Sequence, residues 1–271
     1  MLAANTGRIE MKPYYEHEGS MKPYYDDGKG IQIYLGDCRD ILPELEPVDL
    51  VLTDPPYGIN YKGFSASKSK GLGLLHDGII GDSELMDLRF ILNMRCGVVS
   101  FGANNYPEQL PHKGRWIVWD KRTCAEADRM FGSPFELAWT NRVSGFGNMI
   151  RKMHGGAVNA DRSGKRLHPT QKPCGLFRSI LIDIYPDAQT ILDPFMGSGT
   201  TLVAAQSLGR KCIGIEIEER YCQIAVDRLR QMPLPLAETI SHDRLKEEKQ
   251  GGLFYGSPTD RGNKTENISG Q

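Results

Sequence analysis

The fold is decided by the segment Thr190-Ile-Leu-Asp-Pro-Phe-Met-Gly-Ser-Gly-Thr-Thr201, in which an apolar run precedes a glycine-rich turn and a helical pattern. A strand, a tight turn and a helix in this order form the first part of a βαβ unit. Gly197 and Gly199 let the backbone approach a ligand closely, and a helix N-terminus favours an anionic group. The next expected strand ends at Glu216, where a carboxylate can accept hydrogen bonds from two ribose hydroxyls.

Other ligand-binding loops fit this turn less well. A phosphate-binding NTPase loop needs Gly-Lys-Ser/Thr, which is absent, and a dinucleotide fingerprint needs a third glycine where Leu202 stands. A purely structural glycine turn remains the alternative. Asp193 and Pro194 precede the glycines and suit a nucleoside that carries an amino-acid end and no phosphate. The segment therefore predicts S-adenosylmethionine as the cofactor.

The rest of the chain alternates between strand and helix patterns. We expect strands at 31–35, 48–53, 98–101, 116–119, 135–140, 190–193 and 212–216. We expect helices at 83–95 (with Ser83 as N-cap and Gly97 as the stop), at 176–185 and at 200–208, and a last helix that follows the strand 212–216 and ends at about 230. Such alternation predicts an α/β fold with a largely parallel sheet.

Composition supports one globular domain with two extensions. Apolar residues make up 39% of the 271, charged residues make up 25%, and the net charge is −1. These values exclude a coiled coil, a collagen or a wholly disordered chain. The six cysteines form no CxxC pair and no apolar run reaches about 18 residues, so we expect reduced thiols and a cytoplasmic location.

The boundaries of the domain follow from a repeat and a change in composition. Met11-Lys-Pro-Tyr-Tyr15 recurs as Met21-Lys-Pro-Tyr-Tyr25, which indicates an N-terminal extension over 1–20. The domain then covers 21–230, and the polar, aperiodic residues 231–271 are expected to form a flexible tail.

A second motif, Asp54-Pro55-Pro56-Tyr57, follows the strand expected at 48–53. The carboxyl ends of strands in an open parallel sheet are where ligands bind. A carboxylate, a free carbonyl and an aromatic ring together suit an exocyclic amine on a flat base, which must first be flipped out of a duplex. The alternative is a tight turn whose aspartate is satisfied locally.

The segment 141–167 has no periodicity and is strongly basic. Its basic residues are Arg142, Arg151, Lys152, Arg162, Lys165 and Arg166, against the single acid Asp161. Such a basic composition favours contacts with DNA phosphates, although a solvated loop is the simpler alternative. Lys62 lies in a second basic and glycine-rich loop after Tyr57, which could fold over the flipped base.

Three motifs together resemble those of DNA methyltransferases that modify amino groups, at N6 of adenine or N4 of cytosine. They are Asp54-Pro-Pro-Tyr57, His168-Pro-Thr-Gln-Lys-Pro173 and Asp193-Pro-Phe-Met-Gly-Ser-Gly199. Their order, with the basic segment between the first and the last, resembles the β class. The resemblance covers about 22–230. It implies a Rossmann-like methyltransferase sheet, permuted so that the cofactor-binding βαβ unit is C-terminal and the target-recognition insert lies at about 141–167.

The resemblance also implies roles for single residues. The catalytic residues would be Asp54, Pro55, Pro56 and Tyr57. The methionine end of the cofactor would be held by Asp193, Phe195, Gly197, Ser198 and Gly199, and its ribose by Glu216. The adenine of the cofactor would lie near Asp37 and Cys38, and the segment that closes over the cofactor would contain Thr170 and Lys172. No metal is implied, because a sulfonium already activates the methyl group for displacement.

The target base is inferred from the first residue of the tetrapeptide. Aspartate before Pro-Pro-Tyr is typical of the adenine enzymes in this family, so the resemblance implies methylation at adenine N6. N4-cytosine methylation is the alternative, and an inactive homologue that only binds DNA is a more remote one. Cytosine C5 methylation needs a nucleophilic cysteine, and Pro173-Cys174 lies on the wrong side of the glycine loop.

The partners implied are double-stranded DNA, within a restriction–modification setting, and a second copy of the chain in a homodimer. The tail adds a further hypothesis. Gln250, Leu253 and Phe254 resemble the short peptide by which bacterial proteins dock on the replication sliding clamp. Two adjacent apolar anchors could enter a preformed pocket, although an incidental match is the simpler interpretation.

Overall fold

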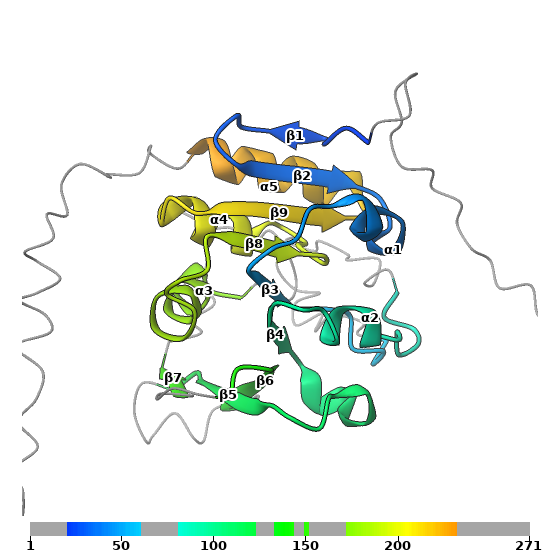
Figure 1. The fold of residues 1–271 in the computed structure, drawn as a ribbon, viewed down its shortest axis with the longest axis vertical. Helices are drawn as coiled ribbons and strands as arrows, with labels where there is room; N and C mark the ends of the chain where they lie inside the picture. The colour runs from blue at the N-terminus through cyan, green and yellow to red at the C-terminus, as the bar shows by residue number, and fades with distance from the viewer. Residues whose placement is uncertain (1–20, 61–80, 123–132, 144–148, 152–171, 232–271) are drawn as a thin grey trace, which may run out of the picture. The chain divides into compact units, whose positions relative to one another are not determined.

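The structure is a computed structural model that describes residues 21–60, 81–122, 133–143, 149–151 and 172–231 (Figure 1). Contacts divide the chain into 1–235 and 236–271, and the second unit lies outside the described residues. Also outside them are Lys62, Lys152, Arg162, Lys165, Arg166, Thr170, Gln250, Leu253 and Phe254. The predictions for these residues, for the extension 1–20 and for the tail 231–271 stay predictions.

A single mixed sheet organises the described residues. Its strands are β1 (Tyr25–Asp26), β2 (Ile31–Leu35), β3 (Leu50–Thr53), β4 (Gly97–Phe101), β5 (Arg115–Asp120), β6 (Phe135–Thr140), β7 (Met149–Arg151), β8 (Thr190–Asp193) and β9 (Lys211–Glu216). Their order is β1-β2-β9-β8-β3-β4-β6-β5-β7. The five strands from β2 to β4 are parallel, whereas β1 and β6 are antiparallel to their neighbours in that group.

Helices lie along the connections of this sheet. They are α1 (Cys38–Ile41), α2 (Arg89–Leu92), α3 (Cys174–Ser179), α4 (Thr200–Ser207) and α5 (Glu219–Gln231), with a π-helical turn, η5 (Ile180–Ile184), continuing α3. Three short 3-10 turns are η1 (Leu42–Glu44), η2 (Ala103–Asn105) and η3 (Pro107–Gln109). The prediction of a helix at 176–185 therefore holds, with a π-helical end.

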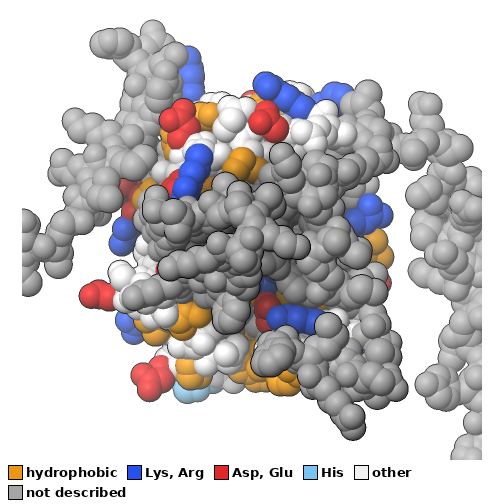
Figure 2. Space-filling view, turned by 180° about the vertical axis from the view of Figure 1, so that it is seen from behind, with side chains coloured by type: hydrophobic (Ala, Val, Ile, Leu, Met, Phe, Trp, Pro, Cys, Tyr) orange, Lys and Arg blue, Asp and Glu red, His pale blue; other side chains and the backbone are white. Residues whose placement is uncertain are grey.

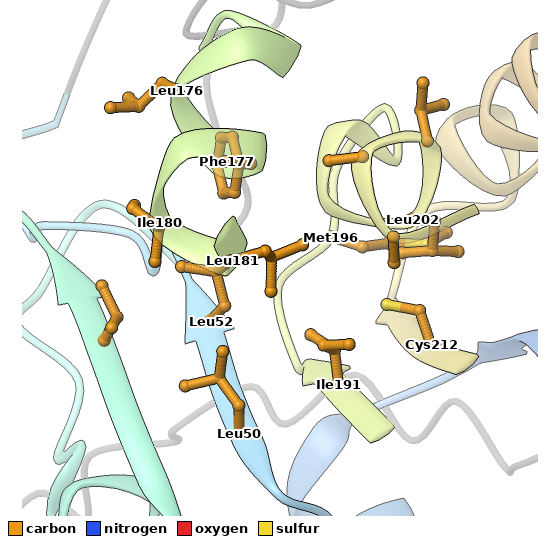
Figure 3. Close-up of a cluster of buried hydrophobic side chains, with 14 of the residues drawn as sticks. Leu50, Leu52, Leu176, Phe177, Ile180, Leu181, Ile191, Met196, Leu202 and Cys212 are labelled. Carbon is orange, nitrogen blue, oxygen red and sulfur yellow. The ribbon is translucent and has the colours of Figure 1, made fainter. Parts of the chain in front are cut away.

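Alternating side chains of the strands build a core on each face of the sheet. In β3, Leu50 and Leu52 join one cluster of buried residues and Val51 joins the other, as expected where successive side chains point to opposite faces. Figure 3 shows the first cluster, in which Leu176, Phe177, Ile180 and Leu181 of α3 and η5 face β3 and β8. The fold is thus a three-layer α/β arrangement.

The topology confirms the predicted permutation. The β8–α4–β9 unit comes last in the chain, yet β8 pairs with β3 near the middle of the sheet. The chain leaves β8 toward β9 on one side, and it leaves β3 toward β4 on the other. Such a reversal between two parallel strands creates a crevice at their carboxyl ends. The loops that follow β3 and β8 meet there.

Two sequence-based expectations were wrong. The helix expected at 83–95 is reduced to Arg89–Leu92, and Ser83 does not cap it. Tertiary contacts occupy the backbone instead, because the Gln109 side chain accepts a hydrogen bond from Leu88 N–H (2.6 Å) and donates one to Met86 C=O (2.9 Å). In the second case, β7 lies within the segment expected to lack regular structure, because it pairs in parallel with β5.

The visible surface carries both signs of charge. On the face drawn in Figure 2, the described Lys and Arg side chains that are visible lie scattered among Asp and Glu side chains. Among the helices that the structure describes, none is long and apolar enough to cross a membrane.

Candidate active site

The candidate site lies at the carboxyl edge of the parallel strands. Parallel registers place Glu216 beside Leu35, and Asp193 beside Gly214, at the ends of their strands. Asp54 directly follows β3, whose last residue, Thr53, pairs with Ser100 of β4. The sheet therefore brings the tetrapeptide and the glycine loop to one edge, as the sequence predicts.

The tetrapeptide is stabilised by its own side chains. Tyr57 donates a hydrogen bond through its hydroxyl to Asp54 Oδ1. Burial, with the Asp54 charge added, raises the pKa of the Tyr57 phenol well above its usual value, so Tyr57 is a hydrogen-bond donor at neutral pH. The Asp54 side chain keeps 20% of its surface exposed and can still meet a ligand.

Lys172 belongs to this group rather than to the glycine loop. Its ammonium donates to Asp54 Oδ2 and, over 3.2 Å, to the hydroxyl of Tyr57. Its Nζ lies 3.4 Å from Glu136 Oε2. The sequence analysis assigned Lys172 to the cofactor, whereas the structure places its ammonium on the Asp54 carboxylate.

Asp82 fixes the backbone that follows the tetrapeptide. Its Oδ1 atom accepts hydrogen bonds from the N–H groups of Tyr57 (2.9 Å), Gly58 (2.8 Å) and Ile59 (3.3 Å). Its side chain is buried, and its own carbonyl accepts from Asn60 N–H at 2.7 Å. One carboxylate thus holds the turn that carries Tyr57.

Gly102 provides the space for the Tyr57 ring. A Cβ built on Gly102 would lie 2.0 Å from Tyr57 Cε1, and the residue has a left-handed φ of +64°. Both facts exclude other residues without a shift of the ring. Neither Asp82 nor Gly102 is recognisable from the sequence, since each acts on the tetrapeptide only through tertiary contact.

The glycine loop is closed by the end of β9. Gly197 N–H donates to Glu216 Oε2 (3.0 Å), and Glu218 N–H donates to Glu216 Oε1 (2.8 Å). Burial raises the pKa of Glu216 to about 7, although these N–H groups act in the opposite direction. Gly199 caps α4 with a φ of +76°, a conformation that favours glycine.

Asp193 has a structural place behind the loop. It is buried, and its carboxylate accepts hydrogen bonds from Thr53 Oγ1 (2.8 Å), Thr201 Oγ1 (2.5 Å) and Phe195 N–H (3.2 Å). Burial raises its pKa to about 6 against the effect of these hydrogen bonds. Asp193 therefore joins β8, β3 and α4 directly beneath the crevice.

Ser198 is held from behind by a residue that the sequence analysis missed. The buried Arg228 of α5 donates from Nη1 to the Ser198 carbonyl (2.5 Å), to Ser198 Oγ (3.1 Å) and to Thr200 Oγ1 (3.2 Å). An arginine near the C-terminus of an amphipathic helix normally suggests a solvated surface, so no sequence signal identifies this role.

Asp37 and Cys38 lie at the same edge, at the start of α1. Asp37 caps α1 by accepting from Arg39 N–H (2.9 Å), and its carboxylate also pairs with the Arg39 guanidinium. Cys38 is buried, and burial raises the pKa of its thiol to about 12. Phe195 of the glycine loop packs half-buried against the same cluster as Cys38.

The two described basic residues of the predicted DNA-binding set lie at opposite edges. Arg151 ends β7 beside Asp120 and is 70% exposed, at the edge that carries Asp54. Arg142 follows β6, whose antiparallel direction takes it to the other edge, where its guanidinium lies over the Tyr185 ring at 5.3 Å. The structure does not bring Arg142 to the tetrapeptide.

No group of three or more His, Cys, Asp or Glu side chains in the described ranges could hold a metal ion. The residues gathered at the edge instead suit an organic ligand. Glycine backbone permits close approach, the Glu216 carboxylate can accept hydrogen bonds from hydroxyl groups, and the Asp54 carboxylate can accept one from an amine.

Comparison with known proteins finds similarity to DNA methylases. Residues 125–227 match a family model described as DNA methylase, of N6 and N4 type. This part of the chain is therefore similar to the N6/N4 DNA methylases. The match runs from before β6 to within α5, so it includes the glycine loop, whereas the tetrapeptide precedes it.

Curated relatives of this chain include type II methyltransferases. M2.LlaDCHI of Lactococcus lactis subsp. cremoris is 27% identical, over 82% of this chain and 94% of the relative. M.HinfI of Haemophilus influenzae is 43% identical, but the match covers 27% of this chain and only 20% of that relative. Among solved structures, the M1.HpyAVI–SAM complex is 25% identical with a TM-score of 0.45, over 73% of this chain and 98% of that one.

Proposed function

We propose that this methylase transfers a methyl group from S-adenosylmethionine to the exocyclic N6 of an adenine flipped out of double-stranded DNA. The observation that carries the proposal is the meeting of the Asp54 carboxylate and the Gly197–Gly199 turn at one crevice of the sheet. A base-binding group and a nucleoside-binding loop must face the same space for methyl transfer to occur.

The residues of the glycine loop fit the proposed cofactor. A Cβ on the left-handed Gly199 would lie 2.6 Å from Ala225 Cβ, so this glycine lets α5 pack closely against the turn, and Glu216 offers carboxylate oxygens to ribose hydroxyls. When bound, S-adenosylmethionine supplies a methyl group on a sulfonium, which needs no metal for activation. Gly197, Gly199 and Glu216 bind and orient it, and Asp193 maintains the loop from below.

The tetrapeptide would act on the amine of the base. Asp54 and the Pro55 carbonyl each accept one N–H of the amino group, which makes its lone pair available. The nitrogen then forms a bond to the methyl carbon, the bond from that carbon to sulfur breaks, and the extra proton leaves the nitrogen through Asp54 to water. Tyr57 holds Asp54 in place and offers an aromatic face to the base.

Adenine N6 is proposed because aspartate precedes Pro-Pro-Tyr, and cytosine N4 is the alternative with the same chemistry. DNA approaches the edge that carries Arg151, which is exposed there. An inactive homologue would not need the Asp54–Tyr57 hydrogen bond or a loop fitted to the cofactor.

The test is modified-base sequencing of host DNA after expression of the wild type and of Asp54→Ala. The proposal expects N6-methyladenine at one sequence motif with the wild type and none with the variant. N4-methylcytosine at one motif would instead establish the alternative. Unmodified DNA from both strains would contradict methyl transfer altogether.

A further inference from the structure

The Lys172 side chain is buried between two carboxylates. It is 7% exposed, and its ammonium contacts Asp54 on one side and Glu136 on the other. It also lies over the Phe101 ring, 4.9 Å from the centroid. Burying an ammonium costs several kcal/mol unless opposite charges compensate for it, so both carboxylates are needed to hold it here.

Glu136 is anchored more firmly than Asp54. It belongs to β6, where it pairs in register with Trp119 of β5. Its Oε1 atom receives an ion pair from Lys121 Nζ at 2.5 Å. Asp54, in contrast, lies in a loop after β3. The sheet therefore fixes the far end of a line of alternating charges that runs from Lys121 through Glu136 and Lys172 to Asp54.

We propose that Glu136 is a positioning residue of the catalytic centre, which acts through Lys172 to hold the Asp54 carboxylate in place for the amine of the target base. The inference rests on the proposed function. Glu136 has no direct role in the reaction, because it contacts Lys172 and not Asp54. Glu136 shares the Lys172 ammonium with Asp54. The ammonium can then orient the Asp54 carboxylate without neutralising all of its negative charge.

Loss of the Glu136 charge leaves Lys172 with Asp54 as its carboxylate partner. The ammonium then pairs with Asp54 alone and competes with the target amine for the Asp54 oxygen atoms. A catalytic group displaced by about 1 Å can lower the rate by about 100-fold. We expect Glu136→Gln to lower kcat by about that factor and to leave the KM for the cofactor unchanged, because Glu136 is remote from the glycine loop.

The pH profile separates this role from a merely structural one. Burial alone would lower the pKa of Lys172, but the charges of Asp54 and Glu136 outweigh it and raise the pKa. The charged or titratable groups facing Lys172 are Asp54, Tyr57 and Glu136, with Lys121 behind Glu136. Without the Glu136 charge, Lys172 loses its proton at lower pH, so the alkaline limb of kcat should move to lower pH.

The experiment measures methyl transfer to DNA by the full-length wild type, Glu136→Gln, Glu136→Asp and the control Glu46→Gln. Glu46 is exposed and precedes β3, at the opposite edge of the sheet. Glu136→Asp keeps the charge and should recover most of kcat, and Glu46→Gln should match the wild type. Thermal melting and cofactor titration establish that each variant is folded.

Three outcomes are decisive. Loss of kcat with a shifted alkaline limb in Glu136→Gln, and recovery in Glu136→Asp, would support the inference. A folded Glu136→Gln with wild-type kcat and pH profile, or one that is slower by the same factor at every pH, would overturn it while the proposed function stands. A wild type that transfers no methyl group to DNA would overturn both.

Discussion

At the scale of single residues, the placement of Tyr57 depends on a glycine that carries no chemistry. The Tyr57 ring occupies the position that a side chain at Gly102 would fill. Gly102→Ala should therefore displace the ring from Asp54 and reduce kcat by about 100-fold. It should also lower the free energy of unfolding by about 1 kcal/mol or more, because alanine is strained at a positive φ.

The matched control is Gly28→Ala, because Gly28 also has a positive φ (+69°) but has nothing within 4 Å of the added Cβ. It should show the backbone strain in thermal melting and keep its wild-type kcat. Equal activity of Gly102→Ala and Gly28→Ala would show that Tyr57 does not need this space.

Glu216 connects cofactor binding to pH. Its pKa of about 7 arises from burial, so the unliganded protein holds a proton there in mildly acidic solution. In the proposed role, the ionised form of Glu216 accepts the ribose hydroxyls, so cofactor affinity should rise as the pH increases through 7. Below pH 7 the Kd should increase by up to about tenfold per pH unit.

Calorimetric titration of S-adenosylmethionine between pH 5.5 and 8.5 measures this effect. Glu216→Gln binds more weakly and serves as the control, since the pH dependence that it retains belongs to the cofactor or to other groups. If the wild type and Glu216→Gln have the same pH dependence, Glu216 does not titrate with cofactor binding.

The raised pKa has the opposite sign for the stability of the unliganded protein. The pKa of Glu216 in the folded state, about 7, lies above the usual glutamate pKa. At pH values between these two pKa values, the folded state therefore binds more protons than the unfolded state. The contribution of Glu216 to the free energy of unfolding is therefore present at low pH and is lost as the pH rises toward 7. Asp193, with a pKa of about 6, acts in the same direction.

At the scale of elements, the turn after β3 is held by Asp82 across a gap of more than twenty residues in sequence. Asp82→Ala removes the acceptor of three backbone N–H groups and should lower the free energy of unfolding by about 1–3 kcal/mol. Asp82→Asn retains one oxygen that can replace Oδ1, so it should keep most of the stability and activity.

Denaturant unfolding and single-turnover methyl transfer measure the two effects. Because the N–H groups of Tyr57, Gly58 and Ile59 are those released, the loss of rate should exceed any loss of cofactor affinity. An Asp82→Ala variant with wild-type stability and rate would show that the turn keeps its shape unaided.

The sequence predicted these elements unevenly. The strands β2, β4, β6, β8 and β9 were expected with nearly their observed bounds, because each contains a short run of apolar, β-branched or aromatic residues. The helix expected at 83–95 is largely absent because backbone groups of Met86 and Leu88 are hydrogen-bonded to the Gln109 side chain. The spacing of apolar residues in the sequence does not show whether the backbone forms a helix or is hydrogen-bonded to a distant side chain.

The candidate site shows the same division. Asp54, Tyr57, Gly197 and Glu216 were identified because each lies in a short motif at the end of a strand. Glu136, Asp82, Gly102 and Arg228 were not, because each becomes part of the site only through packing between distant segments. Lys172 was recognised but assigned to the cofactor, because the sequence does not show that it reaches Asp54.

At the scale of the whole molecule, the direction of β6 separates two arginines that the sequence placed in one DNA-binding set. Arg151→Ala should weaken DNA binding and reduce the slope of log K against log salt concentration by about 0.9, the value for one lost phosphate contact. Arg142→Ala should leave both unchanged, because Arg142 lies at the edge opposite Asp54.

Fluorescence anisotropy with one duplex over a series of salt concentrations measures both quantities. Each variant removes one arginine, so the pair differs only in the edge of the sheet that is affected. A change of slope for Arg142→Ala, with none for Arg151→Ala, would mean that DNA approaches the molecule from the other side.

The central claim is that one crevice, formed by the tetrapeptide and the glycine loop, carries a methyl group from S-adenosylmethionine to an amine in DNA. The most direct measurement incubates the purified protein with duplex DNA and methyl-labelled S-adenosylmethionine, then digests the DNA and identifies labelled nucleosides by mass spectrometry. The account predicts labelled N6-methyldeoxyadenosine with the wild type and none with Asp54→Ala. Equal labelling by Asp54→Ala, or a label found only on a carbon atom of a base, would contradict it.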